Sequence, residues 1–170
     1  IISNNAENFI RFARIIGDMG YREVNLNLGC PSGTVVSKGK GSGFLAKPDM
    51  LDEFLEKVYD SLTDMDVSIK TRIGLKTPDE IENLMDIYNR YPVSELIIHP
   101  RVREDYYNGT PRMDEFMYAY KVSKNPVCYN GDIRIYEDYR RIEGICGKDI
   151  PVMFGRGLVR NPALLLMIKN

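Results

Sequence analysis

The chain has 170 residues but only one histidine, three cysteines and no tryptophan. Its cysteines are widely spaced and form no Cys-x-x-Cys pair, which argues against a disulfide framework and a zinc site. We therefore expect a reducing, cytoplasmic setting. A single imidazole cannot build a histidine-rich metal centre, so we expect no metal, and His99 is the only histidine available for acid-base chemistry.

Long apolar runs and a strong net charge are also missing. No apolar run reaches the roughly 20 residues that span a bilayer, and no signal peptide is visible, so we expect no membrane partner. The formal charge of -1 does not by itself announce a nucleic acid. The first hundred residues are net acidic and the remainder net basic, a pattern that fits either an anionic ligand near the second half or ordinary solvated surface.

The length suffices for one domain with a real core. The chain begins at Ile1-Ile2-Ser3, which resembles the end of a strand, and it stops within an apolar helical pattern at 164–168. We therefore expect a slice of a longer protein.

The stretch 24–31 organises the rest of the sequence. Val24, Leu26 and Leu28 alternate with Asn25 and Asn27, which predicts a strand with one apolar and one amide-bearing face. Unpaired buried amides cost roughly 1 to 3 kcal/mol each, so two of them on one face favour a functional surface over plain core.

A turn follows this strand. Gly29 allows the backbone to turn and Pro31 cannot continue a ladder, so Cys30 is expected at the carboxyl tip of the strand, where α/β enzymes keep their chemistry. The segment 32–43 is rich in Gly, Ser and Lys, and we expect an irregular loop over the mouth of the site.

Strand and helix patterns alternate along the whole chain. Expected strands are 1–3, 24–28, 67–73, 95–101, 126–129 and 151–154, and expected helices begin near residues 5, 48, 77, 113, 136 and 161. Such alternation predicts an α/β fold with a parallel sheet and right-handed crossovers. Because the Gly-rich turns come last and each strand tip is polar, we favour a (β/α)8 TIM barrel over a doubly wound sheet, with strands three to eight present.

Two late turns predict a phosphate site. Asn130-Gly131-Asp132 and Gly155-Arg156-Gly157 follow the last two expected strands. Glycine lets backbone N-H groups approach an anion, and Arg156 can bind phosphate oxygens in bidentate fashion. In a barrel, the loops after strands seven and eight form such a pocket.

Cations are expected inside the barrel. Lys70 and Arg72 lie two residues apart on one strand and share a face. Lys70 could be a Schiff-base lysine, a countercharge to a reduced flavin ring or half of a structural ion pair. His99 could contact the same ligand or be a core histidine. Cys128 and Cys146 are expected to be packing residues.

Cys30 could act as a thiolate nucleophile or as a thiol acid. Only His99 could serve as a base for it, and nothing in the sequence sets up a triad. A thiol with an ordinary pKa near 8.5 is mostly protonated at neutral pH, so we prefer proton donation.

These segments together resemble the tRNA-dihydrouridine synthases. The resemblance covers essentially the whole chain and rests on 24–31, 43–45, 69–74, 99–101, 130–133 and 155–157. It implies a (β/α)8 flavoenzyme in which NADPH reduces FMN, and the flavin then reduces one uridine of tRNA. Hydride would pass from flavin N5 to uracil C6, and the cysteine matched by Cys30 would protonate C5.

The resemblance also implies roles for individual residues. Positions matched to the flavin and its phosphate are Lys70, His99, Asn130, Gly131, Asp132, Gly155 and Arg156, and positions matched to uracil are Asn27, Arg72 and Tyr107. The family's first two barrel strands and its C-terminal helical tRNA-binding domain have no counterpart in this sequence. We therefore expect 1–170 to be a partial TIM-barrel catalytic domain that is inactive alone. Remaining basic residues expected near the mouth are Lys38, Lys40, Arg101, Arg103 and Arg134.

Three rival functions stay open. One is an FMN barrel that acts on a free pyrimidine, as dihydroorotate dehydrogenases do. Another is a non-redox phosphate-binding barrel that uses Lys70 as a Schiff-base lysine, and the third is a barrel that binds RNA without catalysis.

Overall fold

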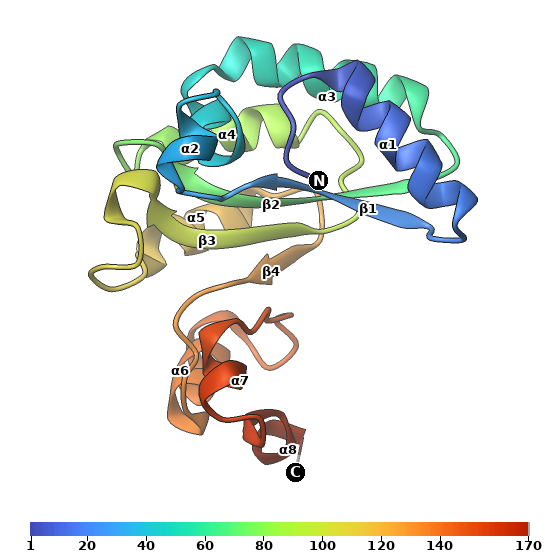
Figure 1. The fold of residues 1–170 in the computed structure, drawn as a ribbon. Helices are drawn as coiled ribbons and strands as arrows, with labels where there is room; N and C mark the ends of the chain where they lie inside the picture. Colours follow the sequence, from blue (N-terminus) through green and yellow to red (C-terminus); the bar gives the residue numbers. More distant parts are fainter. Residues whose placement is uncertain (170) are drawn as a thin grey trace.

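A computed structural model describes residues 1–169 and contains one sheet of four parallel strands in the order β1-β2-β3-β4 (Figure 1). The strands are β1 (Glu23–Leu28), β2 (Asp66–Gly74), β3 (Leu96–Val102) and β4 (Val127–Tyr129). The longer helices are α1 (Ala6–Asp18), α3 (Pro48–Ser61), α4 (Glu80–Tyr88), α5 (Met113–Val122) and α6 (Tyr136–Cys146). A helix separates each strand from the next, as parallel pairing requires. In Figure 1, α1, α3 and α4 lie over one face of the sheet.

Four of the six expected strands form. The first and last expected strands, 1–3 and 151–154, contact the sheet without becoming part of it. The Ile1 amino group donates to Asn25 O at 2.6 Å, and Asn27 N donates to Ile1 O at 2.9 Å. At the other edge Val152 forms an isolated parallel bridge with Tyr129. Each segment has only one residue in register before the chain leaves the sheet, which is too little for a ladder. Their positions were predicted correctly and their extent was not.

The expected loop at 32–43 is instead largely helical. It contains α2 (Gly33–Val36), and η1 (Gly41–Ala46), a 3-10 helix, follows it. Ser42 donates to Cys30 O from both its backbone N, at 3.1 Å, and its Oγ, at 2.8 Å. A side chain at Gly43 would lie 2.7 Å from Val36 O, so glycine here permits close packing of η1 on α2. The prediction of an irregular loop from the Gly, Ser and Lys content of this segment was therefore wrong.

The end of the chain also has more helix than expected. Helix α7 (Arg156–Arg160) begins inside the predicted glycine turn, and Gly155 is its N-cap residue. Helix α8 (Leu164–Lys169) follows, and Asn161 Oδ1 accepts from Ala163 N at 3.1 Å, as predicted for a cap. A further 3-10 turn, η2 (Arg103–Asp105), begins the connection from β3 to α5. None of the helices within 1–169 has the length and hydropathy that crossing a membrane requires.

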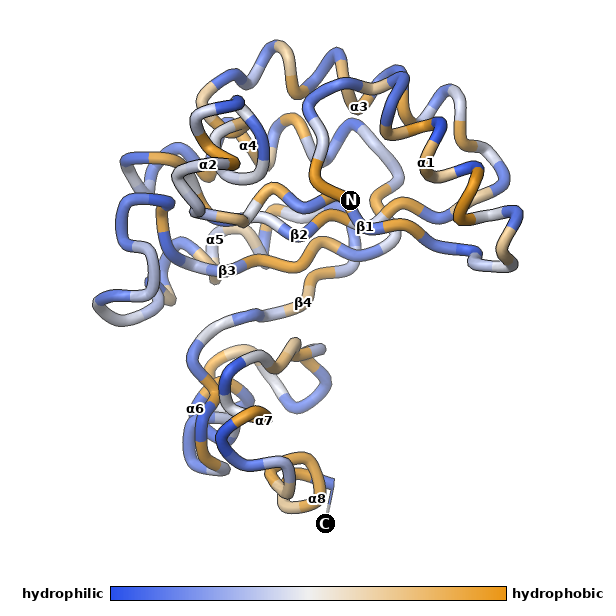
Figure 2. Tube along the Cα trace, in the orientation of Figure 1, coloured by the Kyte–Doolittle hydropathy of each residue, from blue (hydrophilic) through white to orange (hydrophobic). Residues whose placement is uncertain are grey.

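The helix-facing side of the sheet holds the core. Leu26, Ile69 and Leu96 are fully buried, and the strand pairing places them side by side with the alternation expected from the sequence. Phe54 of α3 packs edge-on against Phe9, at 5.6 Å between ring centroids. Figure 2 shows the resulting alternation of hydrophobic and hydrophilic residues along the strands.

The opposite side of the sheet carries most of the polar side chains of the strands. Asn27, Lys70, Ile97 and Cys128 occupy one level across the four strands, because the register pairs them in turn. One step further toward the carboxyl ends, Arg72 lies beside His99. The sheet therefore delivers cationic and amide side chains to one end of one face.

Candidate functional site

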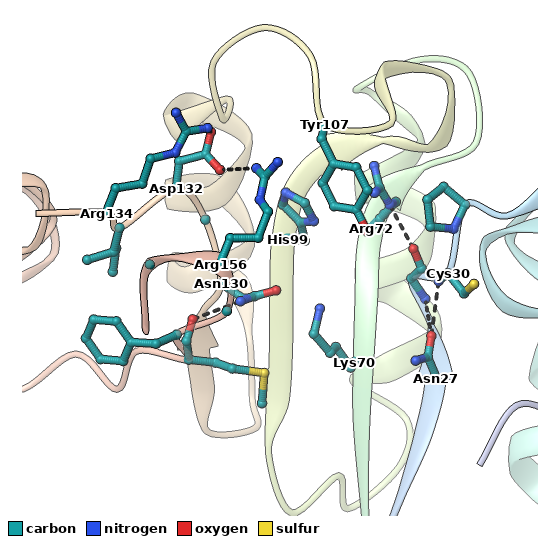
Figure 3. A pocket seen from close by; sticks show the side chains of 18 residues that line it. Asn27, Cys30, Lys70, Arg72, His99, Tyr107, Asn130, Asp132, Arg134 and Arg156 are labelled. Atoms are coloured by element: carbon teal, nitrogen blue, oxygen red, sulfur yellow. Dashed lines mark hydrogen bonds and ion pairs between the residues drawn. The ribbon is translucent and has the colours of Figure 1, made fainter. Parts of the chain in front are cut away.

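A cavity of about 370 Å³ opens at the carboxyl ends of the strands, within the usual range for ligand sites (Figure 3). Its lining includes all the site residues predicted from the sequence: Asn27, Cys30, Lys70, Arg72, His99, Tyr107, Asn130, Gly131, Asp132, Gly155 and Arg156. They come from three strands, from the segments after β1, β3 and β4, and from the start of α7, and the fold brings them together. Their individual roles stay predictions.

The turn that carries Cys30 is held by side chains on both sides. Asn27 Oδ1 accepts from Gly29 N and from Cys30 N, both at 3.0 Å. Ser42 of η1 donates two hydrogen bonds to the carbonyl oxygen of Cys30. Asn27 thus shapes the turn with its oxygen, while its Nδ2 has no protein partner within 1–169 and stays available to a ligand. In Figure 3, Cys30 lies across the cavity from Asp132 and Arg156.

Lys70 is a partly buried cation that forms no ion pair and no hydrogen bond with the residues described. Burial, and then the charge of Arg72, lower the pKa of Lys70 to about 8. Figure 3 shows its amino group extending into the space between Asn27 and Asn130. An amine with this surrounding favours a ligand that is anionic or electron-rich. The structural ion pair considered from the sequence does not form.

Arg72 is buried beneath the cavity and already uses its nitrogens. Nε donates to Gly29 O, Nη1 to Val102 O and Nη2 to Tyr106 O, each at 2.8 Å. Its guanidinium therefore joins the turn after β1 to the end of β3 and to the loop that follows. Contact with uracil stays a prediction for this residue; in this arrangement its guanidinium face, 5.6 Å from the Tyr107 ring centroid, is what borders the cavity.

Arg101 corrects one sequence expectation. It was expected among basic residues at the mouth, but its side chain is 0% exposed. It pairs with Asp132 at 2.7 Å and contacts His99 Nε2 at 3.1 Å. The signal for this placement was present, because Arg101 lies two positions after His99 and so shares its face of β3.

Asp132 collects three guanidinium groups. Besides Arg101, Arg156 lies 2.7 Å from Asp132 Oδ1 and Arg134 lies 3.3 Å from Oδ2. Burial raises the pKa of this carboxyl, but the hydrogen bond and charge of Arg101, then the hydrogen bond of Arg156, outweigh burial and lower it. The ionised carboxylate carries one negative charge against three guanidinium groups, so the surface around Asp132 has a net positive charge. Arg156 also lies over Tyr107, at 4.7 Å from the ring centroid.

Two of the glycines in these turns lie too close to neighbouring atoms to carry a side chain. A side chain at Gly131 would collide with Tyr129 Oη, and one at Gly157 would collide with Ile133 O. A side chain at Gly155 would meet nothing within 4 Å, so its backbone borders open space. Asn130 Nδ2 donates to Met153 O at 2.8 Å and ties the two turns together.

A family model described as Dihydrouridine synthase (Dus) matches residues 1–170. The chain belongs to the dihydrouridine synthase family. The family fold is a (β/α)8 barrel, so the sheet with its two single-residue edges is part of one, which confirms the predicted fold class.

Curated relatives within the family agree. A tRNA-dihydrouridine(16) synthase of Pseudomonas syringae pv. tomato is 31% identical over 153 residues, covering 89% of this chain and 48% of the relative. A probable tRNA-dihydrouridine synthase of Staphylococcus epidermidis is 29% identical over 168 residues, covering 95% of this chain and 50% of the relative. The chain thus spans about half the length of the curated relatives it matches.

Sequence reasoning missed part of the cavity lining. Met153 and Phe154 line the cavity, and they precede the glycine turn that drew attention. Arg134 lines it as well, in accord with its expected place near the mouth, whereas Lys38, Lys40 and Arg103 do not line it. Among the residues described, no cluster of three or more His, Cys, Asp or Glu side chains could hold a metal ion.

Proposed function

We propose that this protein reduces a uridine of tRNA to 5,6-dihydrouridine, with FMN as its cofactor and NADPH as the reductant. The observation that carries the proposal is a single cavity, in a chain of the dihydrouridine synthase family, that places a thiol, an unpaired lysine and two cation-rich glycine turns together. No other family assignment is needed to explain these residues.

The cavity fits a flavin mononucleotide at both ends. Arg134 and Arg156 are about half exposed beside the open backbone of Gly155, so they can leave Asp132 for a phosphate. Lys70, without a protein partner, suits the electron-rich edge of a flavin ring. When bound, FMN supplies the hydride that uracil C6 accepts, after NADPH has reduced the flavin.

The chain's own residues would supply the proton and the orientation. Cys30 would donate its proton to uracil C5, and the hydrogen bonds from Asn27 and Ser42 would keep its backbone in place during the transfer. Asn27 Nδ2 is free to donate to a uracil carbonyl, and Tyr107 offers an aromatic face. A thiol acid needs a reducing environment, for which we propose the cytoplasm.

The parts of the relatives that this chain does not match complete the proposal. We expect them to hold the first two barrel strands and a helical domain that grips tRNA. The surface near the cavity supplies few free cations, so most phosphate contacts would come from that domain.

Lys70 supports one rival function. A pKa of about 8 leaves a useful fraction of neutral amine, which a Schiff-base mechanism requires. Purified full-length protein with a flavin absorption spectrum would favour our proposal. A colourless protein that borohydride links covalently to a carbonyl substrate at Lys70 would favour the rival.

The direct test supplies full-length protein and NADPH with either unmodified tRNA or free dihydropyrimidines and uracil. We expect dihydrouridine to form in tRNA and no comparable turnover of the free bases. Turnover of the free pyrimidine alone would replace the proposal with a dihydroorotate dehydrogenase-like activity.

Cys30→Ala separates catalysis from RNA binding. We expect dihydrouridine formation to fall by about 10² to 10⁴ while tRNA binding stays within a few-fold, because a positioned general acid contributes that much. Cys146→Ala is the matched control, since this thiol contacts Met117 Sδ at 3.6 Å and lies outside the cavity lining. Equal activities of the two variants would remove Cys30 from the mechanism and leave an RNA-binding barrel as the better account.

A further inference from the structure

Arg101 is a buried arginine, and each of its three side-chain nitrogens has a partner on the cavity side of β3. Nε donates to Asn108 O at 3.0 Å, and Nη2 donates to Gly109 O and, at 2.7 Å, to Asp132 Oδ2. Nη1 lies 3.1 Å from His99 Nε2. An arginine bound at this many points has one orientation, so the position of Nη1 against the imidazole is set by the loop and by Asp132.

The hydrogen bond between these two side chains can run in only one direction. A guanidinium carries donors and no acceptor, so Nη1 donates and His99 Nε2 accepts. Nε2 must then be unprotonated, and the neutral imidazole carries its hydrogen on Nδ1. This conclusion depends on the contact itself and on no ligand.

The charges around the ring keep it neutral. Lys70 and Arg72 face the ring from β2, and Arg101 faces it from the same strand, β3. Asp132 is the carboxylate that acts on the ring with the opposite charge. Burial first, and then Arg72, Lys70 and Arg101, lower the pKa of His99 to about 3, with Asp132 acting weakly in the other direction. Tyr107 lies near the ring, at 6.3 Å between centroids.

Nδ1 borders open space. No residue within 1–169 accepts a hydrogen bond from it, and the buried side-chain polar atoms without a partner in that range are Ser94 Oγ and Arg103 Nε. His99 Nδ1 is not one of them, so it reaches accessible surface, and the surface that His99 lines is the cavity.

We propose that Arg101 is a positioning residue that holds His99 as the neutral Nδ1-H tautomer and thereby presents one hydrogen-bond donor to the ligand in the cavity. The proposed function enters only in naming that ligand's acceptor, a flavin carbonyl or ring nitrogen. The same arginine joins His99 to Asp132, so the ring contact and the anion-binding turn are held by one side chain.

The test reads the tautomer directly. Full-length protein labelled with ¹⁵N-histidine is studied by NMR across the neutral pH range, and the His99 signal is assigned by its loss in His99→Gln. We expect a protonated Nδ1 and an unprotonated Nε2 with no titration. A protonated Nε2 in the wild-type protein would overturn the proposal without recourse to any variant.

Variants then assign the effect to Arg101. In Arg101→Met we expect the proton to exchange between the two ring nitrogens, and we expect the pKa of His99 to rise, because Arg101 is one of the groups that lower it. Arg101→Lys keeps the positive charge but loses the planar guanidinium, so it should keep the low pKa of His99 without keeping the single tautomer. Arg134→Gln is the matched control, because Arg134 also contacts Asp132 but not His99, and it should leave both signals unchanged.

Two outcomes separate this inference from the proposed function. An unchanged single tautomer in folded Arg101→Met would refute the role of Arg101 whatever reaction the protein catalyses. A protein without flavin or dihydrouridine formation, but with the Nδ1-H tautomer and its loss in Arg101→Met, would refute the proposed function and leave the role of Arg101 standing. If Arg101→Met does not fold, Asp132→Asn makes the same comparison, because it removes the carboxylate that orients Arg101.

Discussion

The two faces of the sheet use the same alternation of side chains for different ends. On the helix side, Leu26 and Ile69 are fully buried among apolar neighbours, and burial of this kind stabilises the fold. On the cavity side, Lys70 is desolvated beside Arg72, which costs free energy, and the same cations keep desolvated His99 neutral. The contrast shows that one face stabilises the protein while the other holds charges in place for a ligand.

The largest effect is expected on the helix side. Phe54→Ala should lower the free energy of unfolding by about 3 to 5 kcal/mol, because Phe54 is 4% exposed and packs edge-on against Phe9 and Phe44. Chemical denaturation of the full-length protein measures the change. Met50→Ala, on the exposed side of the same helix, should cost less than about 1 kcal/mol. Similar losses in both variants would contradict the assignment of the core to this face.

On the cavity side, the sign should reverse. Lys70→Met should stabilise the cofactor-free protein at neutral pH, by on the order of 2 kcal/mol, while weakening flavin binding. The folded pKa of about 8 lies below the ordinary 10.5, so the unfolded chain binds more protons between these values. The penalty from Lys70 is therefore fully present below pH 8 and disappears as pH rises through 10.5, and the gain in Lys70→Met should disappear over the same range.

Denaturation of cofactor-free protein at several pH values, with flavin titration alongside, tests this reversal. Lys57→Met, an exposed lysine of α3, is the control and should change neither quantity. A loss of stability in Lys70→Met at neutral pH would mean that the amine has a stabilising partner.

The smallest effect concerns the polar pair on the helix side. Tyr88 Oη and Thr71 Oγ1 lie 3.0 Å apart, and both side chains are buried. Tyr88→Phe should cost about 0.5 to 1.5 kcal/mol, because Thr71 Oγ1 keeps its hydrogen bond to Arg72 O. Thermal or chemical denaturation measures it, with exposed Tyr118→Phe as a control near zero. A cost above 3 kcal/mol would show that this pair contributes more than a single hydrogen bond.

Much of the site could be predicted from local pattern. Alternation assigned Asn27, Lys70 and Arg72 to one face, and the position of the glycine turns after the last strands placed Gly155 and Asp132 at the same end. These predictions succeed because side-chain direction along a strand depends on neighbours two residues away. Residues that share an end of parallel strands then share a cavity.

The pairing of those side chains could not be predicted in the same way. Arg72 donates to carbonyls at Gly29, Val102 and Tyr106, and Arg101 reaches Asp132, all across gaps in sequence that no local pattern spans. The helical turns at 33–46 were missed because Ser42 finds its partner at Cys30 O, twelve residues away. Such contacts depend on the register between strands and on how loops close over them.

The sequence by itself determined the α/β class, the polar face and the residues that gather at its carboxyl end, because periodicity and turn chemistry act over a few residues. Only the tertiary structure decided which cation stays unpaired and which is already bound. The amino group of Lys70 has no hydrogen-bond partner among the described residues, whereas the guanidinium groups of Arg72 and Arg101 are bound to other parts of the chain. The reason is that hydrogen-bond partners depend on distances between strands and loops that the chain acquires only on folding.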